Sequence, residues 1–181
     1  GWNFKLKEDR ERAMKHVKEH KPKLVVGSPP CTYFSMLQEL NKHNNRHDQA
    51  CLARFNENLI EAMEHIKFCI ELYRVQMEAG RYWLHEHPWT ARSWDIPEME
   101  ELLKDPRVEV AYADQCQFGL TAKIGAGSDE RGPAKKPTGF AGNSWAIMAE
   151  LRRVCIPGSH VHVKLEGGRA KAAAEYTDCL L

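Results

Sequence analysis

The sequence lacks a long apolar run, a Cys-x-x-Cys pair and an excess of charge of either sign. The first absence excludes a bilayer-spanning helix, and a hydrophobic content of 43% excludes a disordered chain. A balance of 26 Lys and Arg against 25 Asp and Glu does not by itself point to a nucleic-acid or membrane partner. The length of 181 residues suits one domain with a sizeable core, and we expect residues 1–181 to form a single domain.

Six cysteines are scattered along the chain without a short repeated spacing, and no apolar signal segment is present. We therefore expect reduced thiols in an intracellular protein, either nuclear or cytoplasmic. The first residue is Gly1 rather than Met, so we expect the sequence to be an excerpt from a longer polypeptide.

Segments with a helical pattern alternate along the chain with short apolar runs that are typical of strands. The longest segment carries an apolar stripe at four- and three-residue steps and ends at Gly80, which predicts a helix packed on the core. This alternation predicts an α/β fold, a partial Rossmann-like domain with a mostly parallel sheet and flanking helices. Helices are predicted at 8–20, 49–79, 95–104 and 144–154, and strands at 24–26, 81–87, 108–113 and 160–165.

Residues 121–138 combine glycine, proline and basic residues without periodicity, which predicts a mobile loop. Its basic side chains are candidates for contacts with nucleic-acid phosphates, although an unliganded polar loop explains the same composition. These candidates are Lys123, Arg131, Lys135 and Lys136. Asn143 or Ser144 is expected to cap the helix that follows, and a Gly167-Gly168 turn is expected to precede a final Ala-rich helix.

Ligands of open α/β sheets bind beyond the carboxyl ends of the strands, so the residues that follow each predicted strand are the first candidates for a site. After the first strand, Pro29 and Pro30 hold Cys31 in a rigid loop, between Ser28 and Ser35. A thiol held in this way can act as a nucleophile, and the alternative is a small buried thiol in a turn.

The second predicted strand ends in Leu-His-Glu-His-Pro. Side chains alternate along a strand, so His85 and His87 share one face and Glu86 points to the other. If the two strands are neighbours, Glu86 lies near the thiol and could donate a proton to a ring nitrogen. Asp114 and Gln117 follow the third strand and are expected to line the same cleft.

A zinc site is an alternative use of the histidines. His85 and His87 share one strand face, and His160 and His162 are spaced in the same way on another predicted strand, with Cys155 close in sequence. The four imidazoles could converge only if those strands are adjacent. Our first expectation is therefore that the chain has no metal site.

The motif Gly-Ser-Pro-Pro-Cys-x-x-Phe-Ser, followed by a strand that ends in an acid, resembles the DNA (cytosine-5) methyltransferases. Pro30 and Cys31 match the Pro-Cys motif of that family, and Glu86 matches its later glutamate. Gln117-Phe118-Gly119 is similar to the start of a further family motif, without the arginines that normally follow it. Lys136-Pro137-Thr138 followed by Asn143 resembles phage and retroelement relatives of the family.

The resemblance implies a mechanism. The Cys31 thiolate would add to carbon 6 of a cytosine flipped out of DNA, while Glu86 donates a proton to the ring nitrogen. Carbon 5 would then take the methyl group of S-adenosylmethionine. DNA is the implied partner, and RNA stays open.

The sequence also departs from the family. It has no glycine between Gly1 and Gly27, where a glycine-rich turn for the methyl donor is expected, and Gly125-Ala126-Gly127 does not open a helix. The cofactor-binding residues therefore stay unknown. The chain resembles the second half of a methyltransferase, which an upstream segment or a partner would complete.

Three hypotheses follow. The first is a catalytic half-domain of a cytosine-5 methyltransferase, inactive as an isolated piece. The second is a degenerate methyltransferase-like module of a mobile-element polyprotein that binds nucleic acid or protein. The third is a zinc-stabilised interaction domain.

Overall fold

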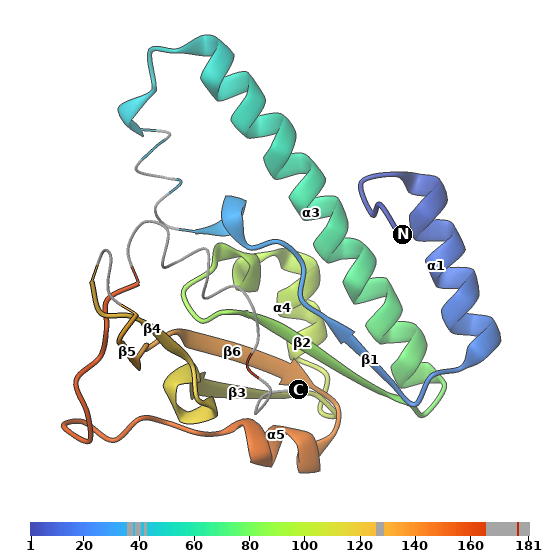
Figure 1. Ribbon diagram of the computed structural model, residues 1–181. Coiled ribbons are helices and arrows are strands. Elements are labelled where there is room, and N and C mark those ends of the chain that lie inside the picture. The colour runs from blue at the N-terminus through green and yellow to red at the C-terminus, as the bar shows by residue number, and fades with distance from the viewer. Residues whose placement is uncertain (36–37, 39–40, 42, 126–128, 166–176, 178–181) are drawn as a thin grey trace.

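The computed structural model describes residues 1–35, 38, 41, 43–125, 129–165 and 177. It has a four-stranded sheet with helices on both faces and a separate two-stranded hairpin, so the chain belongs to the mixed α/β class (Figure 1). The α-helices are α1 (Lys7–His20), α3 (Gln49–Glu78), α4 (Pro97–Leu103) and α5 (Trp145–Leu151). The 3₁₀ helices are η1 (Thr32–Phe34), η2 (Arg92–Asp95) and η3 (Gln115–Phe118). The strands are β1 (Leu24–Gly27), β2 (Tyr82–Pro88), β3 (Glu109–Asp114), β4 (Thr121–Lys123), β5 (Arg131–Pro133) and β6 (Pro137–Gly142).

The strand order of the main sheet is β1-β2-β6-β3. Strands β1 and β2 pair in parallel, whereas β6 pairs antiparallel with both β2 and β3. The expectation of a mostly parallel sheet is therefore wrong, because a reversed strand lies between two strands of the same direction. Since β1, β2 and β3 run the same way, their carboxyl ends still meet at one edge of the sheet.

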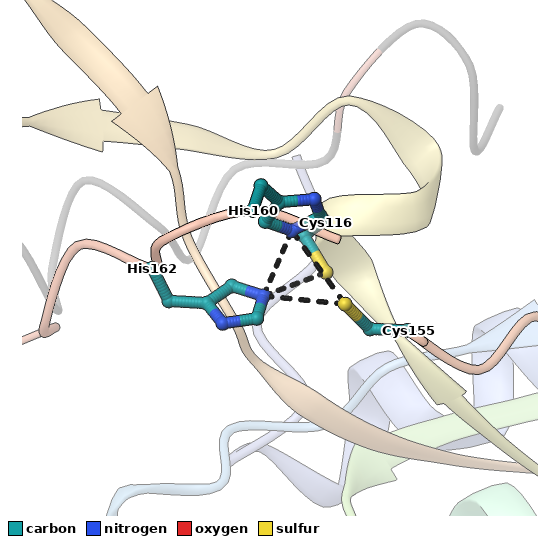
Figure 2. Close-up of side chains that lie close together, drawn as sticks. All are labelled: Cys116, Cys155, His160 and His162. Carbon is teal, nitrogen blue, oxygen red and sulfur yellow. Dashed lines mark hydrogen bonds between the residues drawn. The ribbon is translucent and has the colours of Figure 1, made fainter. Parts of the chain in front are cut away.

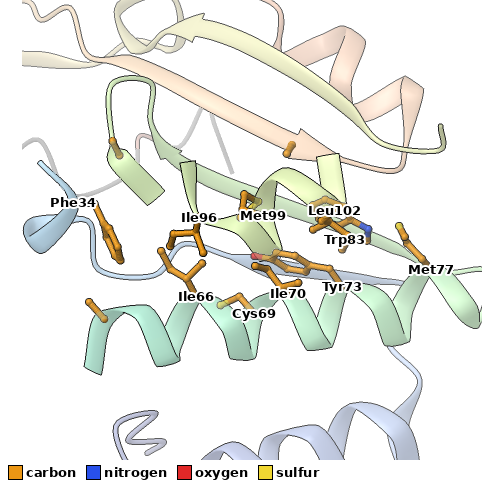
Figure 3. Close-up of a cluster of buried hydrophobic side chains, with 13 residues drawn as sticks. Phe34, Ile66, Cys69, Ile70, Tyr73, Met77, Trp83, Ile96, Met99 and Leu102 are labelled. Carbon is orange, nitrogen blue, oxygen red and sulfur yellow. The ribbon is translucent and has the colours of Figure 1, made fainter. Parts of the chain in front are cut away.

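Helix α3 covers one face of this sheet, as its apolar stripe predicts. It begins after Asp48, whose carboxylate accepts a 2.9 Å hydrogen bond from the Cys51 N–H. Ile66, Ile70 and Tyr73 are almost fully buried against the sheet and α4 (Figure 3). After the helix ends, the chain turns at Gly80, whose φ of 65° favours glycine.

Strand β6 is the strand of the main sheet that sequence reasoning missed. Its sequence Pro-Thr-Gly-Phe-Ala-Gly does not alternate between apolar and polar residues, and glycine and proline favour a turn. In the structure β6 lies between two strands, and its Gly139 faces the rings of Trp94 and Trp89. A Cβ atom added to Gly139 would lie 2.7 Å from the Trp94 ring, so only glycine fits there.

The opposite face of the sheet carries α5. Met148 and Leu151 of this helix pack on Phe140 and the alanines of β3. Ser144 precedes the helix but forms no side-chain cap. Asn143 instead ties the turn before the helix to the start of β2, because its side-chain amide accepts a hydrogen bond from the Trp83 N–H and donates one to the Arg81 carbonyl.

Two further expectations need correction. Residues 121–138 contain the β4–β5 hairpin and the start of β6 rather than one mobile loop, because Leu120, Ala122 and Ala134 form a small buried cluster. Residues 160–165 form no strand. The expected Gly167-Gly168 turn and the Ala-rich helix lie outside the described residues. In the part of the chain that is described, every helix is too short or too polar to cross a bilayer.

Candidate functional site

The loop after β1 reaches the sheet edge where the carboxyl ends of the parallel strands meet. Gly27 is the last residue of β1, and Cys31 follows four positions later, immediately before η1. The Phe34 N–H donates a 3.0 Å hydrogen bond to the Cys31 carbonyl, and Phe34 itself is buried in the core. Ser35 ends η1. The Cys31 side chain is half-buried, in a loop that β1 precedes and η1 follows.

Glu86 joins this loop to the neighbouring strand. The Ser28 hydroxyl donates a 2.8 Å hydrogen bond to Glu86 Oε2 across the parallel pair of β1 and β2. The Glu86 side chain is buried, with a residue exposure of 6%. From the sequence, Glu86 is expected near Cys31 only if β1 and β2 are neighbours. In the structure these two strands pair in parallel.

His87 holds the loop from the opposite face of β2. Its Nε2 lies 3.1 Å from the Pro29 carbonyl, which can only accept, so Nε2 carries the proton. Burial lowers the His87 pKa to about 4, so the ring is neutral at pH 7 and Nδ1 accepts a hydrogen bond from the Ser93 hydroxyl. His87 therefore positions the Pro-Pro-Cys loop.

His85 is part of the core rather than of a cleft. Its Nδ1 lies 2.9 Å from the Tyr73 hydroxyl, and burial lowers its pKa to about 3. The hydroxyl of Tyr73 passes directly over Gly27, where an added Cβ would lie within 1.8 Å of it. Gly27 is therefore required for the packing of α3 on β1.

The protonation of Cys31 depends on two nearby charges. Burial raises the pKa of the thiol above its ordinary value, the positive charge of Lys136 opposes this, and the negative charge of Glu86 adds to it. Lys136 comes from the segment that enters β6, and its charge also affects His87. The thiol is therefore protonated in the resting protein.

A second cluster lies beyond the end of β3. Cys116, Cys155, His160 and His162 each direct one ligand atom toward a common centre, and these atoms lie within 4.8 Å of one another (Figure 2). The alternative zinc set of His85, His87, His160 and His162 is thus wrong for the first two residues, which lie elsewhere, and our first expectation places no metal site here. Sequence reasoning missed Cys116, although a cysteine two residues beyond a strand end was a visible signal.

Asp114 supports this second cluster. Its buried carboxylate accepts hydrogen bonds from the Tyr112 hydroxyl at 2.7 Å and from the Cys155 N–H at 2.9 Å. Burial opposes ionisation, but these bonds and the charge of Lys135 hold the Asp114 pKa below its ordinary value. Gln117 is exposed beside Cys116. Asp114 and Gln117 therefore contact the second cluster rather than the Cys31 loop.

Three of the four expected phosphate-binding side chains have partners within the chain. Lys123 forms an ion pair with Asp129, and the guanidinium of Arg131 donates hydrogen bonds to Thr121. The Lys135 ammonium lies 3.4 Å from the Asp114 carboxylate. The Lys123–Asp129 pair is exposed and contributes little to stability, so a phosphate could displace it.

The cavity beside the Cys31 loop lacks the groups that S-adenosylmethionine needs. A cavity of about 360 Å³ lies beside the end of β1, bounded by Gly27, Ser28 and Pro29 on one side and by α1 and α3 on the other. None of its lining residues is an acid that could hold ribose hydroxyls or the ammonium and sulfonium charges of the methyl donor. Its walls are mainly aliphatic and aromatic, as in Val25, Val26 and Phe68.

Comparisons of the chain with protein-family models, with curated proteins and with solved structures found no match.

Proposed function

We propose that this chain carries the base-activating part of a cytosine-5 methyltransferase-type site, with Cys31 as nucleophile and Glu86 as the group that exchanges a proton with the base. The observation that carries the proposal is the 2.8 Å hydrogen bond between Ser28 and Glu86 Oε2, which joins the Pro-Pro-Cys loop to the acid from 58 positions away. The position of the site at the carboxyl edge of a parallel strand pair supports it.

The addition requires a base outside the duplex stack. The Cys31 sulfur forms a bond to carbon 6 of the ring, and the double bond between carbons 5 and 6 breaks. Its electron pair makes carbon 5 nucleophilic, and the ring nitrogen takes one proton. The thiol and the carboxyl group together must therefore carry one proton when the reaction begins.

The resting protein holds that proton on Cys31, because burial and the Glu86 charge raise the pKa of the thiol. Transfer of the thiol proton to Glu86 would generate the nucleophile and the acid in a single step. Lys136 assists, because its positive charge favours the thiolate. Ser28 and His87 then act as positioning residues for the carboxyl group and the loop, respectively.

Methyl transfer needs a donor site, and the cavity beside β1 does not supply one, so the test should not depend on methyl transfer. Once carbon 5 is nucleophilic, it can take a proton from water and later lose its original hydrogen. We therefore expect the chain to release tritium from single-stranded or duplex DNA that contains [5-³H]cytosine, without S-adenosylmethionine.

Cys31→Ser should abolish this release, and Cys51→Ser is the matched control because Cys51 lies on α3 outside the site. Release that is equal in both variants would reject Cys31 as the nucleophile. Tritium release from RNA but not from DNA would reassign the substrate.

A second candidate function is nucleic-acid binding without catalysis. The raised pKa of Cys31 favours it, because a buried thiol is a weak nucleophile. Binding would then weaken steeply with salt and would survive Cys31→Ala. Tritium release that depends on Cys31 would exclude this alternative.

A further inference from the structure

We propose that Cys116, Cys155, His160 and His162 form a tetrahedral zinc site that holds the segment after α5 against the end of β3. The site is separate from the Cys31 loop, and the proposal does not depend on the base chemistry. Two thiols and two imidazoles from three parts of the chain converge here without a helix or strand to bring the last two together.

The three nitrogen–sulfur distances match those around a tetrahedral zinc ion, whereas the two imidazole nitrogens lie closer together than two nitrogens on such an ion. Zinc bonds of about 2.3 Å to sulfur and about 2.0–2.1 Å to nitrogen place a nitrogen and a sulfur about 3.6 Å apart and two nitrogens about 3.4 Å apart. His162 Nε2 lies 3.4 Å from Cys116 Sγ and 3.5 Å from Cys155 Sγ. His160 Nε2 lies 3.6 Å from Cys155 Sγ and 2.9 Å from His162 Nε2.

The groups around the ligands hold them in the orientation that a metal needs. The Ser159 hydroxyl lies 3.2 Å from His160 Nδ1, so Nδ1 can donate to it and leave the Nε2 lone pair directed at the centre. Asp114 accepts the N–H of Cys155 and so fixes the backbone of that ligand. Figure 2 shows the two sulfur atoms and the His162 ring turned toward one another.

The chemistry of the four donors selects the metal. Two thiolates and two neutral imidazoles in a tetrahedral arrangement favour zinc over the hard cations, which prefer oxygen ligands. All four positions come from the protein, so the site is closed and its role is structural rather than catalytic.

The fold explains what such an ion would stabilise. Residues 152–165 form neither helix nor strand, yet Val163 donates its N–H to Pro133 at 2.8 Å and packs on the apolar cluster of the β4–β5 hairpin. Few backbone hydrogen bonds hold this segment, so metal ligation would be its main attachment. The hairpin leads into Lys135 and Lys136, so the ion would also support the basic segment beside Cys31.

The test is the metal content of the whole chain, purified without chelator and measured by inductively coupled plasma mass spectrometry. We expect close to one zinc per chain, lost in Cys116→Ser and in His162→Ala. Cys51→Ser and His16→Ala are the matched controls, because Cys51 lies outside the cluster on α3 and His16 stacks on His20 on α1, where two histidines could bind metal adventitiously. Both controls should keep the zinc.

Cobalt substitution guards against variants that lose metal only because they unfold. Cobalt(II) in the parent protein should give the intense visible bands of a tetrahedral ion and a thiolate charge-transfer band. Weak bands of a six-coordinate ion, zinc retained in Cys116→Ser and His162→Ala, or a Cys116–Cys155 disulfide in metal-free folded protein would each overturn the proposal.

Discussion

Two cysteines that follow strands at the same edge of the sheet have different neighbours. Cys31 follows β1 as a single thiol, with Glu86 and Lys136 as the charges that affect it. Cys116 follows β3 and meets a second thiol and two imidazoles. The comparison shows that position in a fold brings a thiol to a site, whereas the residues around it determine whether it is a nucleophile or a metal ligand.

The largest effects should come from substituting the two cysteines one at a time. Cys31→Ser removes the nucleophile, so tritium release from [5-³H]cytosine DNA should fall by at least about 1,000-fold, a typical loss for a covalent catalyst. The zinc content should not change. In Cys116→Ser the zinc should be lost while tritium release from the folded fraction persists. Loss of both properties in either variant would mean that the two regions are not independent.

The two regions also have different supporting residues. Asp114 supports the Cys116 cluster, and Asp114→Ala tests this role. This change removes the acceptor of the Cys155 N–H and of the Tyr112 hydroxyl inside the protein. We expect a loss of about 3 kcal/mol in the free energy of unfolding. Zinc affinity should fall by about 10–100-fold. Denaturant unfolding and competition with a zinc chelator measure the two effects, and unchanged zinc affinity would contradict the assigned role of Asp114.

His87→Phe is the corresponding test at the Cys31 loop. It leaves the Pro29 carbonyl and the Ser93 hydroxyl without their buried partner, so the free energy of unfolding should fall by about 2–3 kcal/mol. Tritium release should slow because the loop is less fixed, and zinc affinity should stay the same. A decrease in zinc affinity with normal tritium release would contradict the assignment of His87 to the Cys31 loop.

The smallest effect concerns the pH dependence of the thiol. Because the pKa of Cys31 is raised, its alkylation by iodoacetamide should increase at higher pH than in the same protein unfolded in urea. Glu86→Gln removes a charge that raises this pKa, so the profile should move to lower pH. Lys136→Ala removes a charge that lowers it, so the profile should move to higher pH. Peptide mass spectrometry follows Cys31 alone, and shifts of the same sign in both variants would contradict the proposed electrostatics.

The elements with a strong period could be predicted from sequence. The stripe from Ile66 to Met77 predicts α3 and its buried face, and the apolar run before Gly27 predicts β1. Strand β6 could not be predicted, because it lies between two strands and its Gly139 has to fit under the Trp94 ring. That is a tertiary constraint that leaves no alternation in the sequence.

The two sites also differ in how far the sequence predicts them. The Cys31 loop could be located because a rigid proline pair follows a strand, and the proximity of Glu86 follows once β1 and β2 are neighbours. The second cluster could not be assembled, because Cys116 and His162 are 46 positions apart and the residues that carry His160 and His162 form no strand. The packing of Val163 on the hairpin and the hydrogen bond from the Cys155 N–H to Asp114 bring them together.

The most direct test of the proposed base chemistry is the covalent capture of a base. DNA that contains pyrimidin-2-one in place of cytosine presents an electrophilic carbon 6 to the thiol and needs no methyl donor. The chain should form a covalent complex, and peptide mass spectrometry should place the DNA adduct on Cys31. The absence of a complex, or an adduct on Cys51 or Cys116 instead, would contradict the assignment of Cys31 as the nucleophile.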